Sequence, residues 1–350
     1  MNNQQATAAF TSPLPAAGRA RMPHLPVLDG WRGISILSVL AAHMLPLGPK
    51  HLQLNDSAAC FGMAIFFTLS GFLITSTLYF HPSVRDFFIR RACRILPAAW
   101  LFMVIVLAYI HATPAVWRAN MLFYANLPPY YLPDITAHMW SLCVEVQFYL
   151  GIGIVFLLLR RKGLALLPFI CVAVTVGRVF HGATVDIATP YRIDEILSGT
   201  SLAYLFHGKL SASLKRALSR ISPFVMLALL CASCLVALPH LIWLNYLRPY
   251  CAAALVGTTL FHEGTGWNRM LESRSLKYIA SISYALYVWH PLATVGWFAQ
   301  GSKLMKYAKR PIGFALAFAL AHVSTFYFEK YWIKLGKRLT TRKPSRRLAS

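Results

Sequence analysis

Apolar residues recur along the chain in long runs from about residue 30 to residue 335, and no long polar interval separates these runs. An α-helix needs roughly 17–25 mostly apolar residues to cross the hydrocarbon core of a bilayer. The pattern therefore predicts an all-α, polytopic membrane bundle of about ten transmembrane helices. We place these helices at residues 28–47, 58–80, 96–113, 138–159, 164–181, 191–207, 222–239, 241–261, 277–298 and 311–334.

Composition and charge agree with a membrane protein. Of the 350 residues, 57% are hydrophobic and 13% are charged, whereas soluble domains carry about 25% charged residues. The formal net charge of +23 does not require a nucleic-acid partner, because Lys and Arg gather in short connections between the apolar runs. These connections are 85–94, 160–162, 207–220, 263–277 and 334–347. Positive charge favours the cytoplasmic side, so we predict that both termini are cytoplasmic.

Domain organisation follows from the same pattern. We predict one integral membrane domain at residues 25–335, preceded by a flexible cytoplasmic tail (1–24) and followed by a basic cytoplasmic tail (336–350). The basic segment 301–310 departs from the charge rule and makes the last helical hairpin the least regular. The connection 114–137, which contains "LPPYYLPD", is predicted to be a long outer loop that shapes a substrate entrance.

Several common catalytic signatures are absent. We find no GxxxxGK[ST] loop, HExxH motif or GxSxG elbow, which argues against an ATPase, a zincin and a serine hydrolase. Cys231 and Cys234 form a CxxC within an apolar run that has no neighbouring His or Cys. We therefore interpret them as small buried residues and predict no metal site.

Arg32 and His43 lie eleven residues apart in one apolar run. Eleven residues make almost three helical turns and roughly 16 Å of axial rise, so both side chains leave nearly the same face. Each has a structural alternative: Arg32 can snorkel to the interface, and His43 can bond to another helix. A charge within a span costs about 2.5–3.5 kcal/mol, so charged side chains normally face a cavity or a partner.

Other polar residues in or near the spans suggest a binding site. Arg91 and Arg94 are one helical turn apart and can bind a phosphate, or they can anchor the helix to the cytoplasmic side. Glu145, which follows Trp140 and Ser141, can face a cavity or favour the positive end of a helix dipole. His290 can line the outer half of the cavity or pack within the bundle. Asp194 and Glu195 follow Arg192 closely enough for local ion pairs, which indicates a structural or gating role.

Seven runs together resemble one family. They are "LDGWRGISILSVLAAH" (28–43), "GMAIFFTLSGFLIT" (62–75), "IRRACRILPAAW" (89–100), "HMWSLCVEVQFYL" (138–150), "RIDEILSGTSLA" (192–203), "ISYALYVWHP" (282–291) and "FYFEKYW" (326–332). In this order they resemble the acyltransferase-3 family of integral membrane acyltransferases, which includes bacterial O-antigen and exopolysaccharide O-acetyltransferases.

The resemblance implies a set of roles. Arg32 and His43 match the family's Arg-X10-His motif, and Arg91 and Arg94 match its RxxR motif. It also implies an acyl-CoA donor, usually acetyl-CoA, a hydroxyl acceptor on a glycan or lipid-linked sugar, and a location in the bacterial inner membrane. One departure is that Val146 follows Glu145 where the family commonly has an acidic pair. The chain also ends near residue 350 without the SGNH hydrolase-like domain of some relatives, so we expect transfer to finish in the membrane domain or on a separate protein.

These roles suggest a mechanism. We expect Arg32, Arg91 and Arg94 to bind CoA phosphates while the thioester reaches His43, which acts as general base toward the acceptor hydroxyl. Glu145 would fix the tautomer of His43 or bind the acceptor. Trp140, Ser141 and His290 are candidate acceptor-binding residues, and Ser70, Ser141 and Trp140 are candidate oxyanion donors. A covalent acyl-histidine is a second route.

A different class of function also fits a polar bundle. A secondary transporter of a sugar or an anionic substrate would use buried Arg, Glu and His without consuming acyl-CoA. Within the acyltransferase reading, the sequence leaves open the acceptor (O-antigen, exopolysaccharide, a lipid-linked sugar or a small molecule). It also leaves open the length of the acyl group, the side of the membrane on which transfer is completed, and the oligomeric state.

Overall fold

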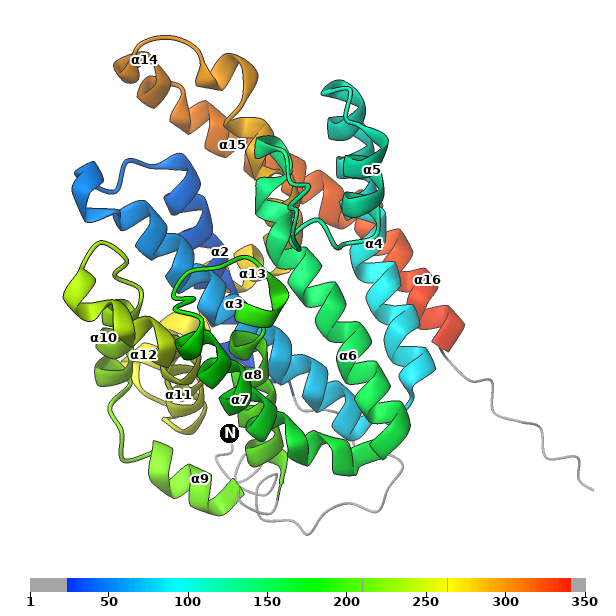
Figure 1. Ribbon diagram of the computed structural model, residues 1–350, viewed down its shortest axis with the longest axis vertical. Coiled ribbons are helices and arrows are strands. Elements are labelled where there is room, and N and C mark those ends of the chain that lie inside the picture. Colours follow the sequence, from blue (N-terminus) through cyan, green and yellow to red (C-terminus); the bar gives the residue numbers. More distant parts are fainter. Residues whose placement is uncertain (1–23, 209–210, 263, 341–350) are drawn as a thin grey trace, which may run out of the picture.

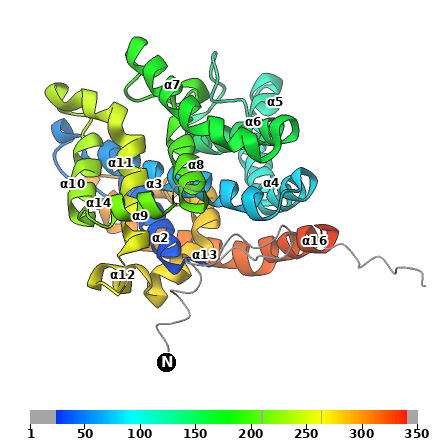
Figure 2. The ribbon, with the colours of Figure 1, turned by 90° about the horizontal axis from the view of Figure 1, so that it is seen from below.

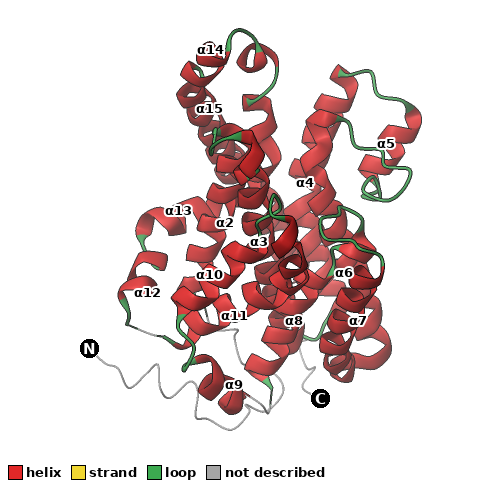
Figure 3. Ribbon diagram, turned by 60° about the vertical axis from the view of Figure 1, so that its left-hand side comes forward, coloured by secondary structure: helices red, strands yellow, loops and turns green. Residues whose placement is uncertain are grey.

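The computed structural model describes residues 24–208, 211–262 and 264–340, and within these ranges the chain is helical with no β-strand (Figure 3). The α-helices are α2 (Pro26–Met44), α3 (Leu54–Phe80), α4 (Val84–Tyr109), α5 (Pro114–Met121), α6 (Trp140–Gly163), α7 (Leu167–Phe180), α8 (Asp194–His207), α9 (Ser211–Leu218), α10 (Pro223–Ser233), α11 (Arg248–Phe261), α12 (Gly266–Leu271), α13 (Arg274–Trp289), α14 (Lys303–Ala308), α15 (Arg310–Val323) and α16 (Lys330–Thr340). A π-helical stretch, η8 (Ser324–Glu329), joins α15 to α16. The all-α prediction is confirmed.

A helix overlaps each of the ten predicted ranges, but the count of ten spans is not confirmed. Among the described residues, four helical stretches are long and apolar enough to cross a membrane: Lys50–Phe80, Val84–Tyr109, Asp134–Phe180 and Lys303–Thr340. A fifth is added if α9 and α10, which are bent by 85°, form one span. Helices α7, α8 and α11 have 14 residues each, or roughly 21 Å at 1.5 Å per residue. That is shorter than a hydrocarbon core of about 30 Å, so ten spans stay a prediction.

The connections gather at two opposite ends of the bundle. In Figure 1, the connection from α3 to α4, the end of α6 and helix α9 lie at the lower end, whereas the α2–α3 connection, α5 and α14 lie at the upper end. This separation agrees with the predicted alternation of these connections. The cytoplasmic position of the termini stays a prediction, because residues 1–23 and 341–350 lie outside the described residues. The predicted boundary at residue 336 falls within α16.

Two connections expected to be loops contain helices. The basic connection 85–94 is the first part of α4, which begins at Val84, and the Ser83 hydroxyl caps it by accepting a hydrogen bond from the Asp86 N–H at 3.3 Å. Arg91 and Arg94 therefore project from a helix that continues into the predicted span. The outer connection 114–137 contains α5 and the start of a 3-10 helix at Asp134–Met139.

Helix α3 is at the centre of the bundle and packs along α2 and α8 (Figures 1 and 2). Its crossing with α8 depends on Gly71 and Gly199. A Cβ atom added at Gly71 would lie 1.9 Å from the Ile196 carbonyl oxygen, and one at Gly199 would lie 1.9 Å from the Thr68 carbonyl oxygen. Small residues let helix backbones approach closely in membrane bundles. The glycine of "LSGFL" (69–73) therefore serves helix packing.

Candidate active site

Helix α2 carries the polar stripe predicted from its sequence. Arg32, Ser35, Ile36 and Val39 line one small cavity of about 20 Å³ together with residues of α3 and α13. His43 is one turn beyond Val39, so it continues the same face of the helix. The predicted common face of Arg32 and His43 is therefore supported by the lining of this cavity.

His43 meets His290, which comes from the opposite end of the chain. The His43 Nδ1 and His290 Nε2 atoms are 2.9 Å apart. His290 Nδ1 lies 2.9 Å from the Tyr287 carbonyl oxygen and 3.2 Å from that of Leu286. Carbonyl oxygens only accept, and a neutral imidazole carries one N–H, so the His290 proton is on Nδ1. His290 Nε2 therefore accepts from His43 Nδ1, which leaves His43 Nε2 unprotonated.

A buried network supports this pair. His138 packs edge-on against His290, with ring centroids 5.2 Å apart. Tyr287 donates to the His138 carbonyl oxygen and accepts a hydrogen bond from Ser141 Oγ at 2.9 Å. Ser141, a predicted acceptor-binding residue, is 1% exposed, and its hydroxyl donates to the Tyr287 hydroxyl. His290 was predicted to line the cavity, and in the structure it accepts a hydrogen bond from His43.

Glu145 does not bond to His43 as one of the two hypotheses suggested. Its Oε1 accepts from Ser70 Oγ and, at 2.5 Å, from the Tyr149 hydroxyl. Glu145 lies on the first two turns of α6, which face Ser70 on α3. The histidine pair is formed by α2 and the end of α13 instead. Ser70, a predicted oxyanion donor, therefore donates its hydroxyl hydrogen bond to this carboxylate.

Three arginines converge near Glu145. Arg32 on α2 interacts electrostatically with Arg91 and Arg94 on α4 and with Glu145. The Arg91 guanidinium lies 5.5 Å from the centre of the Tyr149 ring. Asp29 also interacts electrostatically with Arg32, and Glu329 interacts with Arg94. Positive charge is in excess where Arg91 and Arg94 lie beside Arg90 and Lys337, with Asp86 as the carboxylate of that lining. Such a cluster is suited to phosphate groups, which guanidinium binds with two parallel hydrogen bonds.

An open pocket of about 400 Å³ adjoins the arginines. Its lining includes Arg90, Arg91, Arg94 and Asp86 of α4 and Lys337 of α16. Arg90 Nε donates to Thr340 Oγ1 at 2.8 Å and thereby joins α4 to α16. The pocket lies beside the connection from α3 to α4, and Figure 1 shows that connection at the lower end of the bundle. It is larger than the cavity of about 20 Å³ that Arg32 lines. We call it the arginine pocket.

Sequence reasoning missed several buried polar residues. Trp289 Nε1 donates to Ser324 Oγ at 3.1 Å, and Ser324 donates to the Glu329 carboxylate at 2.9 Å. The π-helical turn at Ser324–Glu329 overlaps the quoted "FYFEKYW" region, and π-helical turns are frequent at functional sites. A buried acid within an apolar run was the signal that could have identified Glu329.

A second group of ions surrounds Arg192. Glu195 pairs with Arg192 at 3.4 Å, as expected, but more closely with Arg248 at 2.6 Å. Asp194 pairs with Arg178 at 2.5 Å instead of Arg192. Arg178 and Arg248 could not be assigned from the sequence, because they are 16 and 53 residues from their partners. The predicted substrate-binding residue Trp140 lies beneath Arg192, with the guanidinium 5.3 Å from its ring centre.

The cysteines and histidines do not gather into a metal-binding group. Within the described ranges, no group of three or more His, Cys, Asp or Glu residues could hold a metal ion. Cys231 and Cys234 are free thiols. Cys234 is buried as predicted, but the prediction for Cys231 was wrong: it is exposed on α10, most of whose side chains are not buried.

Comparison with known proteins places the chain in a family. A model of the acyltransferase domain of the acyltransferase-3 family matches residues 25–329. The putative peptidoglycan O-acetyltransferase YrhL of Bacillus subtilis is 26% identical over 313 residues, which cover 76% of this chain and 48% of that protein. The peptidoglycan O-acetyltransferase OatA of Listeria monocytogenes is 26% identical over 324 residues, which cover 78% and 50% of the two chains.

A third relative is the O-acetyltransferase OatA of Staphylococcus aureus, 26% identical over 313 residues that cover 76% of this chain and 50% of that protein. The chain thus spans about half the length of the curated relatives it matches. No solved structure matches it. The family match covers the arginine cluster, the histidine pair and Glu145 alike, and on this basis the chain belongs to the acyltransferase-3 family.

Proposed function

We propose that the protein transfers an acetyl group from acetyl-CoA to a hydroxyl group of a cell-envelope glycan. The observation that carries this proposal is the fixed tautomer of His43, whose Nδ1 is bonded to His290 Nε2 at 2.9 Å. An imidazole held in this way presents an unprotonated nitrogen, which a general base requires. The peptidoglycan O-acetyltransferases among its relatives support a glycan of the cell wall as the acceptor.

The donor fits the arginine end of the stripe. We infer that the CoA phosphates bind in the arginine pocket, where Arg91 and Arg94 supply bidentate donors. Arg32, deeper along α2, would hold the donor at the start of the stripe. The axial distance from Arg32 to His43, roughly 16 Å, is comparable to an extended pantetheine arm. A thioester at the end of that arm would be within reach of the histidine pair.

The reaction then follows from the position of the proton. The acceptor oxygen attacks the thioester carbonyl carbon as its proton passes to His43 Nε2. The C–S bond breaks, and the imidazolium returns the proton to the leaving thiolate, giving the acetyl ester and CoA. His290 accepts the His43 Nδ1–H bond throughout and so stabilises the transient imidazolium. Direct transfer of this kind needs no acyl-enzyme, although trapping of acetylated His43 after rapid quenching would favour the covalent route.

The experiment is acetyl transfer by purified protein in lipid vesicles, with radiolabelled acetyl-CoA and peptidoglycan fragments as acceptor. We expect the wild type to release CoA and acetylate the glycan. His43→Ala should lose at least about 10²-fold in rate while retaining donor binding, and Arg91→Ala should weaken donor binding by about tenfold. His51→Ala is the matched control, because His51 is exposed in a 3-10 helix outside the site. A folded protein that neither binds nor consumes acetyl-CoA would contradict the proposal and favour a transporter.

A further inference from the structure

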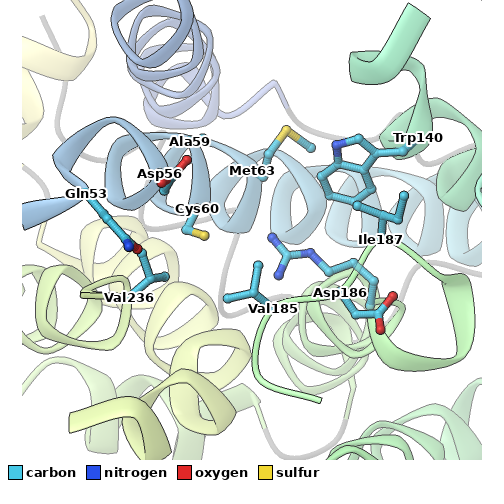
Figure 4. Close-up of a pocket in the computed structure, with 11 residues that line it drawn as sticks. Gln53, Asp56, Ala59, Cys60, Met63, Trp140, Val185, Asp186, Ile187 and Val236 are labelled. Carbon is cyan, nitrogen blue, oxygen red and sulfur yellow. The ribbon is translucent and has the colours of Figure 1, made fainter. Parts of the chain in front are cut away.

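A second pocket of about 350 Å³ lies along the first turns of α3. It is lined chiefly by Gln53, Asp56, Met63, Trp140, Val185 and Arg192, and we call it the Arg192 pocket. Figure 4 shows Gln53 and Val236 at one end and Trp140 and Ile187 at the other. Asp186 lines it as well, so its walls combine two carboxylates, an amide, a guanidinium and an indole, and nothing in the proposed donor site uses it.

Arg192 is the unusual member of this lining. It is 2% exposed, and its Nε and one terminal nitrogen make no hydrogen bond within the described part of the chain. Arg178 and Arg248 take the close contacts of the two carboxylates, Asp194 and Glu195, at 2.5 and 2.6 Å. Arg192 is left with a contact of 3.4 Å to a Glu195 oxygen that Arg248 already occupies.

The ion cluster and the Trp140 ring hold Arg192 in place without pairing its Nε and one terminal nitrogen. A buried donor without a partner costs about 1–3 kcal/mol, more when it is charged. Asp56 and Asp186 line the pocket together with Arg192, so the feature that points to a ligand is the unpaired donors of Arg192 and not a net charge. A ligand oxygen placed against the guanidinium would supply the missing acceptor.

The pocket also communicates with the histidine pair. Asp56 lines it and interacts electrostatically with the His43 imidazole. Met63 lines both this pocket and the small cavity along α2 that contains Arg32 and Tyr287. The Arg192 pocket and the cavity along α2 are therefore neighbours that share one side chain of α3.

We infer that the Arg192 pocket binds a sugar ring of the acceptor, with Arg192 donating to an oxygen of a ring substituent and Asp56 accepting from a ring hydroxyl. This assignment rests on the proposed function, because it gives the acceptor of that reaction its binding site. Both donors and acceptors on the walls fit a polyhydroxylated ligand, whereas Asp56 would repel a simple anion. The volume is within the range of about 300–1,000 Å³ for small-molecule sites.

The test measures sugar binding separately from acetyl transfer. Val185 lines the pocket and is 52% exposed, so Val185→Cys provides a thiol at its mouth. We expect a chitin tetrasaccharide or a muramidase-released peptidoglycan disaccharide to slow modification of this introduced thiol by a methanethiosulfonate reagent at least fivefold, as read by mass spectrometry. Addition of Arg192→Gln or Asp56→Asn should remove that protection, whereas Lys50→Gln, an exposed charge outside the pocket, should leave it intact.

Transfer kinetics complete the test. Arg192→Gln and Asp56→Asn should raise the KM for the glycan at least tenfold and leave the KM for acetyl-CoA within twofold. If the wild type transfers acetyl groups but no sugar protects the introduced thiol, the inference fails and the proposed function stands. If sugars protect that thiol but acetyl-CoA is never consumed, the proposed function fails and the pocket remains a sugar site. The Asp56 side chain is exposed. An equal rise of the KM for the glycan and the KM for acetyl-CoA in Asp56→Asn would overturn the assignment.

Discussion

At the scale of single residues, the direction of one hydrogen bond decides which nitrogen can act as a base. The backbone carbonyls of Leu286 and Tyr287 hold the proton of His290 on Nδ1. Its Nε2 then accepts from His43, so the tautomer of the proposed base is set by a residue 247 positions away. A hydrogen-bond acceptor of this kind commonly fixes the role of a catalytic histidine.

We predict that His290 acts as a positioning residue. His290→Leu removes the acceptor and should lower kcat by about 10²-fold, the lower bound for a positioned base, while the KM for acetyl-CoA stays unchanged. His290→Gln keeps an acceptor oxygen near the position of Nε2 and should recover most of this loss. Steady-state kinetics in the same lipid, with thermal unfolding to check the fold, measure both. Equal activity of the two variants would rule out the hydrogen bond as the cause.

The candidate site shows where sequence reasoning stops. The spacing of Arg32 and His43 predicted a common helical face, because helical geometry is local. The partner of His43 could not be chosen, since His290 and Glu145 are both polar residues of other spans. The choice depends on how three helices pack, and it puts Glu145 beside Ser70 instead. The ion pairs that join α8 to α7 and α11 were missed for the same reason.

At the scale of helices, α4 joins a basic connection and a span in one element. Ser83 caps the helix at Val84, so the turn that contains Arg91 and Arg94 is held rigidly over the arginine pocket. The sequence suggested a later start, because basic residues before an apolar run are typical of a loop at the membrane surface. A rigid helix fixes the direction of both guanidinium groups, which bidentate phosphate binding requires.

We predict that Arg91→Gln weakens donor binding through the phosphates alone. The KM for acetyl-CoA should rise by about tenfold, equivalent to about 1.4 kcal/mol, with little change in kcat. S-acetylpantetheine lacks the nucleotide phosphates, so wild type and variant should use it equally. Comparing both donors in one assay isolates the phosphate contribution, and an equal loss with S-acetylpantetheine would place Arg91 elsewhere.

The crossing of α3 and α8 makes a second prediction about elements. Gly71→Ala puts a methyl group 1.9 Å from the Ile196 carbonyl oxygen, which should destabilise the fold by about 1–3 kcal/mol or more. Gly151 on α6 has no neighbouring atom within 4 Å of such a methyl group. Gly151→Ala should therefore be neutral or stabilise by about 0.5–1 kcal/mol. Thermal unfolding midpoints in one detergent compare the two, and a similar decrease in both would contradict close packing at Gly71.

At the scale of the whole molecule, the two proposed binding pockets lie toward opposite ends of the bundle. The arginine pocket adjoins the connection from α3 to α4, whereas the Arg192 pocket includes the first turns of α3. Helix α3 has 27 residues, or roughly 40 Å at 1.5 Å per residue. One helix of that length reaches across a bilayer, so the donor and the acceptor would approach His43 from different sides of the membrane.

We predict that the two ends are accessible from opposite faces of a vesicle. Arg85→Cys lies on an exposed turn at the start of α4, and Val185→Cys lies at the mouth of the Arg192 pocket. An impermeant thiol reagent added outside oriented proteoliposomes should modify one of these introduced thiols, and the other only after the lipid is permeabilised. Acetyl-CoA should support transfer only when it is added to the side on which the thiol at position 85 reacts.

The same two variants assign the faces in cells. Because the excess of Lys and Arg at the α3–α4 end predicts the cytoplasm, intact cells should show the thiol at position 85 protected and the thiol at position 185 modified. The wild-type protein, which lacks both introduced thiols and keeps the native cysteines, gives the background. Modification of both positions from the same face would place donor and acceptor on one side, and transfer across the membrane would then be excluded.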